Sequence, residues 1–250
     1  VFVIIAESFT LLNFVVIICF LSGLFFIAFI IAAVLLSVAA LGLAPRQQAN
    51  MLNEKKTQIV KALGEDPATV AYDSVITKAV ILDASGAVVS EDVAEVFAAL
   101  NDLKASFAAE RYPLFVATSG VVVPLYGAGL WGPIWGYIAL GTDMNTVKGI
   151  VLDHSGETPG LGAEITTSKH QAMYPGKTVY EGDAIVGVTL KKGGADKSNP
   201  HEVDAITGGT KTSDGVTAMI SDCLNYYKPY FDAARAAATE VEAESNTINE

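Results

Sequence analysis

Several features that would point to particular functions are missing from this chain of 250 residues. It has only two cysteines, Cys19 and Cys223, which lie too far apart in the sequence to be a metal-binding pair. The chain therefore offers no complete iron–sulfur or zinc site of its own, and we predict no metal site. The phosphate-binding pattern Gly-x-x-x-x-Gly-Lys is absent, as is a dinucleotide fingerprint in which a glycine-rich turn opens a helix.

Charged residues are missing from Ser8 to Leu43, and the stretch from Phe14 to Leu36 is almost wholly apolar. A transmembrane helix needs roughly 20 apolar residues, whereas the apolar region of a secretory signal has about 7–15. The sequence therefore predicts one membrane span within residues 1–43.

Basic residues are also scarce, because 16 Lys and Arg stand against 27 Asp and Glu, for a net charge of -11. This balance argues against a nucleic-acid partner and against binding to an anionic membrane surface through a basic patch. The simplest interpretation of the acidic charge is solubility.

The rest of the chain has patterns of both helices and strands, which predicts an α+β domain on a membrane tether. Residues 44–115 are expected to form a helix-rich first part, residues 116–238 the main domain, and residues 239–250 a frayed acidic tail. Pro45 should end the apolar segment, and Pro229 should break or kink the last helix. Helices are predicted at 47–63, ending before Gly64, at 91–109 and at 215–238, and strands at 79–82, 86–89, 115–123, 135–140, 147–152, 184–190 and 202–206. The Asp-Ala-Ser-Gly turn at 83–86 predicts that the first two strands form a hairpin. The last helix is expected to bury an apolar stripe of Val216, Met219, Ile220, Cys223 and Leu224.

Three glycine-rich segments stand out as candidate sites. The first, Gly127–Pro133, presents Trp131, whose indole could form a wall for a planar ligand or pack in the core beside a turn. The second, His154–Gly162, is a structured loop whose backbone amides could bind a ligand. In the third, Asp204–Ser213, two glycines hold Thr210 on a turn where an enzyme could reach its hydroxyl.

The Thr210 turn precedes a predicted helix. A phosphate would fit there, because free amides and the positive dipole end of a helix favour negative charge. The alternative is a turn in which Thr210 merely caps the helix.

The order of these segments carries a resemblance. Gly-Leu-Trp at 129–131, Asn-Thr-Val-Lys-Gly at 145–149, Gly-Glu-Thr-Pro-Gly-Leu-Gly at 156–162 and the Thr210 motif follow one another. Together they resemble the C subunits of bacterial Na⁺-translocating NADH:quinone oxidoreductases. The related G subunits of Rnf complexes share the Glu-Thr-Pro-Gly-Leu-Gly loop and the threonine, but the first two segments favour the quinone reductases. Gly209 departs from the family, which usually has alanine there.

The resemblance implies that residues 116–238 are an FMN-binding domain and that a flavin transferase esterifies Thr210 with FMN. It implies no catalytic side chain, because the flavin carries the electrons. NADH and ubiquinone would bind other subunits of the membrane complex, with Na⁺ export coupled to electron transfer. The expected cofactor-binding residues are Thr210 with Thr207, Gly208, Gly209 and Thr212, the loop residues Glu157, Thr158, Gly160, Leu161 and Gly162, and Trp131 near the ring.

The family further implies a single-pass protein of the bacterial inner membrane with its domain in the periplasm. Arg46, Lys55 and Lys56 follow the span and would, by the positive-inside rule, place the domain in the cytoplasm. We favour the periplasm, because large domains translocate regardless of charge. Two alternatives remain: an Rnf-type G subunit, and a membrane-anchored scaffolding module without a cofactor.

Overall fold

The computed structural model describes residues 2–248, and side chains from residue 21 to residue 239. The chain divides into two compact units, residues 1–53 and 54–250. The fold is α+β, with one long apolar N-terminal helix followed by a β-rich domain with helices. The division of the remaining chain into a first part at residues 44–115 and a main domain at residues 116–238 stays a prediction.

The first helix, α1 (Phe2–Ala62), continues through Pro45, so the helix predicted at 47–63 is the last part of α1 rather than a separate helix. Proline removes one helical hydrogen bond, but Arg, Gln and Ala follow it, and these residues favour helix. The predicted end before Gly64, whose φ is +83°, is confirmed. Within the described residues, the stretch Leu21–Ala62 is long and apolar enough to cross a membrane.

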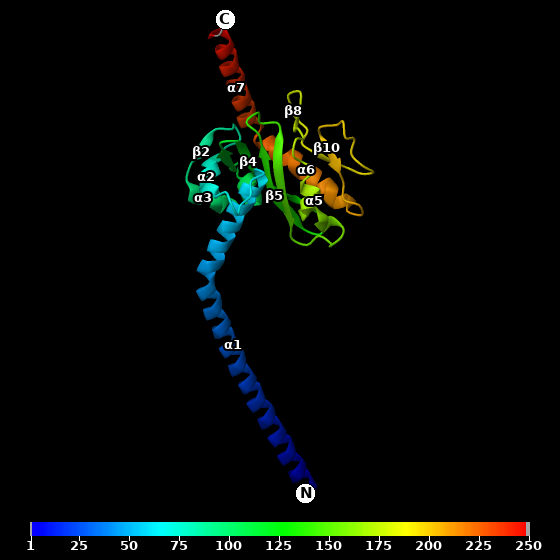
Figure 1. Ribbon diagram of the computed structural model, residues 1–250. Helices are drawn as coiled ribbons and strands as arrows, with labels where there is room; N and C mark the ends of the chain where they lie inside the picture. Colours follow the sequence, from blue (N-terminus) through cyan, green and yellow to red (C-terminus); the bar gives the residue numbers. More distant parts are fainter. Residues whose placement is uncertain (1, 249–250) are drawn as a thin grey trace. The chain divides into compact units, whose positions relative to one another are not determined.

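A six-stranded antiparallel sheet forms the centre of residues 54–250, in the order β2-β1-β3-β4-β5-β6 (Figure 1). The hairpin predicted from the Asp-Ala-Ser-Gly turn is confirmed, and the Asp83 carboxylate accepts hydrogen bonds from two amides of the turn. The single strand predicted at 115–123 is wrong, because a turn at Gly120, with φ +143°, divides it. The strands are β1 (Ile76–Leu82), β2 (Val88–Ser90), β3 (Tyr112–Ala117), β4 (Gly120–Ala128), β5 (Pro133–Leu140) and β6 (Val147–His154).

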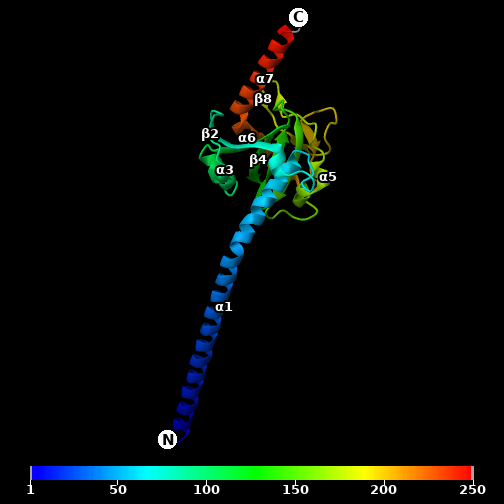
Figure 2. The same cartoon turned by 60° about the vertical axis from the view of Figure 1, so that its left-hand side comes forward.

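Helices cover both faces of this sheet. The apolar stripe predicted for the helix after the Thr210 turn is confirmed, and it packs α6 (Thr210–Tyr226) on one face. The other face packs against Ile59 of α1, against Leu63 just after that helix, and against α3 (Val93–Ala99). Figure 2 shows α3 near the edge strand β2. The members of the α6 stripe are Val216, Met219, Ile220, Cys223 and Leu224.

The helix predicted at 91–109 is instead two short helices, α3 and α4 (Leu103–Ala108). Asp102 explains the division, because its side chain accepts a hydrogen bond from the amide of Ala105 and caps α4. The helix α3 ends at its C-cap Leu100, and the capped helix α4 begins three residues later.

The last helical region is also divided. It begins at Thr210 rather than Gly215 and breaks at Tyr227, two residues before Pro229, as the proline predicts. The tail predicted to fray from residue 239 instead continues the helix α7 (Lys228–Ile248), while residues 249–250 lie outside the described residues.

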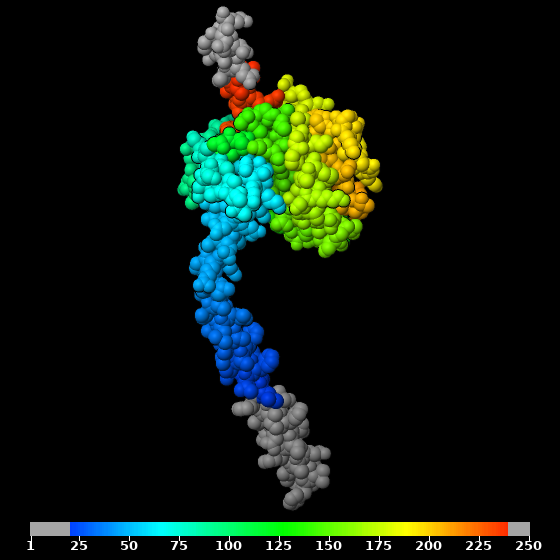
Figure 3. All heavy atoms as spheres, viewed as in Figure 1, coloured from blue at the N-terminus to red at the C-terminus, as the bar shows by residue number. Residues whose placement is uncertain are grey.

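Short elements connect β6 to α6, and their surface is yellow to orange in Figure 3. The strand predicted at 184–190 is interrupted at Gly187, whose φ is +69° and which lies against the backbone of Ser221. The strand predicted at 202–206 is confirmed in its first residues. The elements between β6 and α6 are the 3-10 helix η1 (Gly162–Thr166), α5 (Ser168–Gln171), β7 (Tyr180–Glu181), β8 (Ala184–Ile185), β9 (Thr189–Lys191) and β10 (Glu202–Asp204). One other short helix, α2 (Tyr72–Val75), precedes β1.

Candidate functional site

The three glycine-rich segments meet at one end of the sheet. A Cβ on Gly215 of α6 would lie 2.2 Å from the carbonyl oxygen of Ala128, so α6 touches the β4–β5 hairpin directly. A Cβ on Gly208 would lie 2.6 Å from the side chain of Leu161, which joins the Thr210 turn to the loop after β6. Glycine is needed at Gly215 because the two backbones approach so closely, and at Gly208 because its φ is +76°.

Thr210 is the first residue of α6, and its side chain is exposed. Gly209 occupies the N-cap position and has no side chain with which to cap, so the interpretation of Thr210 as the capping residue is wrong. Gly208, with φ +76°, turns the chain into the helix. The hydroxyl of Ser213 accepts a hydrogen bond from the amide of Ile206 and closes this turn. The Thr210 hydroxyl is therefore presented to solvent at a helix N-terminus.

Thr212 has the opposite environment. It is 1 % exposed, and its hydroxyl donates a hydrogen bond of 2.6 Å to Oε2 of Glu157. Glu157 is 5 % exposed, and its Oε1 accepts a hydrogen bond of 2.9 Å from the amide of Trp131. Burial raises the pKa of the Glu157 carboxyl, but hydrogen bonds from Thr212 and the amides of Trp131 and Leu130 outweigh it and hold the pKa below its ordinary value. The carboxylate thus stays ionised inside the site.

Large apolar side chains lie exposed around the Thr210 turn. Trp131 is 69 % exposed, so its interpretation as a core residue is wrong, and the adjacent Leu130 is 53 % exposed. Leu161 is 41 % exposed and packs on Gly208. Exposed aromatic and aliphatic side chains beside a glycine turn are suited to cover a planar ligand.

The structure places the remaining predicted residues around this centre. Thr207, Gly208, Thr158 and Gly160 are exposed, whereas Gly209 and Gly162 are buried. Sequence reasoning missed the bond between Thr212 and Glu157, because 55 residues separate them and no local pattern pairs them.

The run Gly127–Gly132 has the glycine spacing of a dinucleotide-binding turn, but it joins the antiparallel strands β4 and β5. A dinucleotide site needs a strand followed by a helix whose N-terminus meets the pyrophosphate. The hairpin instead borders an open depression of about 600 Å³, lined by Lys104, Tyr126 and residues 127–133.

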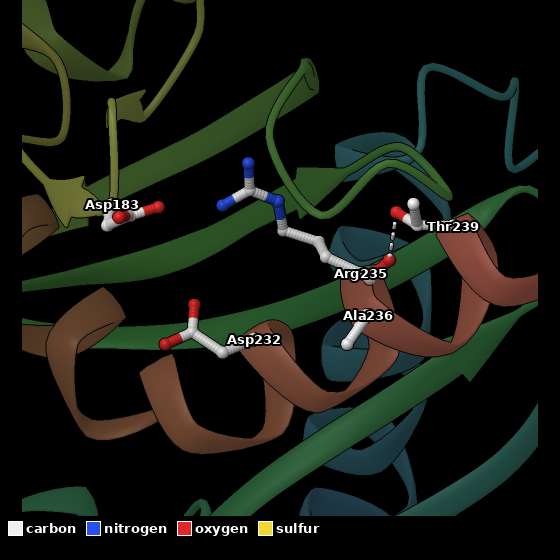
Figure 4. A pocket seen from close by; sticks show the side chains of 5 residues that line it. All are labelled: Asp183, Asp232, Arg235, Ala236 and Thr239. Carbon is white, nitrogen blue, oxygen red and sulfur yellow. Dashed lines mark hydrogen bonds between the residues drawn. The ribbon is translucent and has the colours of Figure 1, made fainter.

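A second concave region, of about 370 Å³, lies at α7, where Arg235 extends toward Asp183 of the β7–β8 turn (Figure 4). The Arg235 guanidinium lies 4.1 Å from the ring centre of Tyr180, whose hydroxyl donates to Asp232 at 2.9 Å. These partners fix α7 on the domain. Within the described residues there is no group of three or more His, Cys, Asp or Glu side chains that could hold a metal ion.

Known proteins are similar to this chain in both sequence and fold. The FMN-binding domain family matches residues 129–225, which contain much of the three glycine-rich segments. The C subunit of the Na⁺-translocating NADH-quinone reductase of Pseudomonas aeruginosa is 31 % identical over 245 residues, covering 86 % of this chain and 93 % of the relative. This chain belongs to the family of these C subunits.

Solved structures of the C-subunit family have the same fold. The crystal structure of the Parabacteroides distasonis member has a TM-score of 0.69 at 34 % identity, over 76 % of this chain and 96 % of that one. The Shewanella oneidensis NqrC structure has a TM-score of 0.63 at 28 % identity, over 75 % and 99 %. As a member of this family, the chain is one part of a larger complex and carries an FMN-binding domain.

Proposed function

We propose that the Thr210 hydroxyl carries FMN through a phosphoester and that the domain relays electrons within a Na⁺-translocating NADH-quinone reductase. The observation that carries this proposal is the position of Thr210, which is exposed at the start of α6 while Thr212 is buried. A flavin transferase requires an accessible hydroxyl. The amides and dipole of a helix N-terminus favour the phosphate that would remain attached there.

The surrounding residues fit the flavin. The indole of Trp131 and the side chain of Leu161 offer exposed apolar surface near the Thr210 turn, which suits a planar ring. Thr158 and Gly160 are exposed in the same loop as Leu161 and offer polar groups to the ring edge. Bound FMN would supply the redox chemistry, whereas the protein orients the ring, shields its faces and holds its phosphate.

The proposal also assigns partners and a location. NADH and quinone would bind other subunits, and a flavin transferase would attach the cofactor. The apolar stretch in α1 supports anchoring in the bacterial inner membrane as a single span. We place the domain in the periplasm, where a covalent bond keeps the flavin from diffusing away.

In-gel fluorescence tests the proposal. The full chain, produced together with a flavin transferase and denatured on a gel, is expected to fluoresce under ultraviolet light. Thr210→Ala should abolish this fluorescence. Thr166→Ala, which changes another exposed threonine, should leave it intact. A dark wild-type band would contradict the proposal and favour a scaffolding module without cofactor.

A further inference from the structure

Three separate segments of the site converge on one buried carboxylate. Glu157 comes from the loop after β6, Trp131 from the β4–β5 hairpin, and Thr212 from the first turn of α6. The two Glu157 oxygens accept from the Thr212 hydroxyl at 2.6 Å and from the Trp131 amide at 2.9 Å. Each partner uses a different oxygen, so the carboxylate links the hairpin to the helix.

Two glycines make room for this carboxylate. A Cβ on Gly129 would lie 2.4 Å from Oε1 of Glu157, and a Cβ on Gly162 would lie 2.3 Å from Oε2 and 2.5 Å from the Thr212 hydroxyl. These distances are far shorter than van der Waals contact, so only glycine fits on both sides. The two glycines therefore leave the space that the carboxylate occupies between the hairpin and the loop after β6.

The helix explains why Thr210 and Thr212 differ. Successive residues of an α-helix are rotated by about 100° about its axis, so residues two apart point to nearly opposite sides. The side chain of Thr210 is exposed, and that of Thr212 turns inward to Glu157. One helical turn thus presents one hydroxyl to solvent and a second to the protein.

We propose that Glu157 and Thr212 are positioning residues: they form a clasp that fixes the Trp131 hairpin against the N-terminus of α6, and neither of them binds the flavin. This inference rests on the proposed function, because it concerns the walls of the site that Thr210 would serve. The clasp orients the indole toward the cofactor attached at Thr210. Without the Thr212 hydroxyl, Oε2 of Glu157 is left buried without this donor, and the link between hairpin and helix weakens.

Hydrogen exchange tests the clasp whether or not FMN is present. The amide of Trp131 is the reporter, because its N–H is donated to Glu157. In the full chain in detergent, Thr212→Val should speed its exchange by roughly tenfold or more, since bonds to charged groups are the stronger ones. Thr212→Ser keeps the hydroxyl and should restore slow exchange.

Thr217→Val is the matched control on the same helix. The Thr217 hydroxyl accepts from the amide of Leu190 at 2.9 Å and donates to the carbonyl of Ser213 at 3.1 Å, and neither partner belongs to the clasp. This variant should lower overall stability without selectively speeding exchange at Trp131. Equal Trp131 exchange rates in the wild type and in Thr212→Val would overturn the clasp.

Flavin spectroscopy tests the positioning role. With FMN attached, Thr212→Val should still fluoresce on a denaturing gel, but the visible circular dichroism of its flavin should fall and its midpoint potential should shift. If the flavin of Thr212→Val has the same visible circular dichroism and the same midpoint potential as the flavin of the wild type, the positioning role is overturned. If the wild type carries no FMN, the proposed function fails, and the exchange rate of the Trp131 amide still decides whether the clasp exists.

Discussion

Acidification should destabilise the domain through one buried histidine, His170 of α5. This side chain is 3 % exposed, and its Nε2 lies 3.0 Å from the hydroxyl of Tyr174. Among the side chains that the structure describes, none hydrogen-bonds its Nδ1. Burial lowers the pKa of His170 from 6.5 to about 4, because a charged imidazole would lose its hydration there.

The direction and size of this stability change follow from the linkage between protonation and folding. Because the folded pKa lies below the unfolded one, the stabilising contribution is complete above pH 6.5 and is lost as the pH falls toward 4. The full difference of about 2.5 in pKa corresponds to about 3 kcal/mol, and about 2 kcal/mol of it should be lost by pH 5. The Glu157 carboxyl, whose pKa is held below its ordinary value, should add little above pH 5.

Urea unfolding of the full chain in detergent, at pH 7.5 and pH 5, measures this loss. His170→Gln cannot titrate, and its amide can still hydrogen-bond the Tyr174 hydroxyl. We expect it to be less stable at pH 7.5 but to lose about 2 kcal/mol less than the wild type between the two pH values. An equal loss in both proteins would refute the assignment of the acid sensitivity to His170.

Four further substitutions, one of them a control, test the site and the core beneath it. In Gly162→Ala the new Cβ would lie 2.3 Å from Oε2 of Glu157 and 2.5 Å from the Thr212 hydroxyl, so the free energy of unfolding in urea should fall by about 1–3 kcal/mol. Gly156→Ala is the control, because no atom lies within 4 Å of its Cβ, and it should change the free energy of unfolding by about 0.5 kcal/mol or less. Tyr227→Phe removes a buried 2.8 Å hydrogen bond to the carbonyl of Pro113 and should cost about 1 kcal/mol by the same assay. Trp131→Ala should keep the covalent flavin on a denaturing gel and raise the fluorescence per flavin in the native protein, and unchanged native fluorescence would place the ring away from the indole.

Local chemistry in the sequence was sufficient to predict much of the fold. The apolar stripe of α6 and the Asp83 hairpin follow from patterns within one element and its turn. The wrong predictions are those in which one continuous sequence pattern was taken as a single strand or helix but forms two. The turn at Gly120 divides an apolar run that has no other break, and the Asp102 cap divides an alanine-rich stretch.

The site, like the fold, was predictable where the signal is local and not where it depends on tertiary contacts. The glycines and the exposed threonine of the Thr210 turn are a local signal, and the sequence order of the three segments suggested a shared ligand. Which threonine faces solvent depends on where α6 begins, and the helix begins five residues earlier than its apolar pattern predicts. The clasp between Glu157 and Thr212 depends on tertiary packing, which no spacing in the sequence encodes.

Peptide mass spectrometry of the purified full chain tests the central claim most directly. After production with a flavin transferase and digestion, we predict that the peptide containing Thr210 is heavier by one FMN minus one water, with fragment ions that assign the added mass to Thr210. The same peptide from Thr210→Ala should have no added mass. An unmodified Thr210 peptide in the wild type, or a flavin attached to Thr207 or Thr212, would contradict the account.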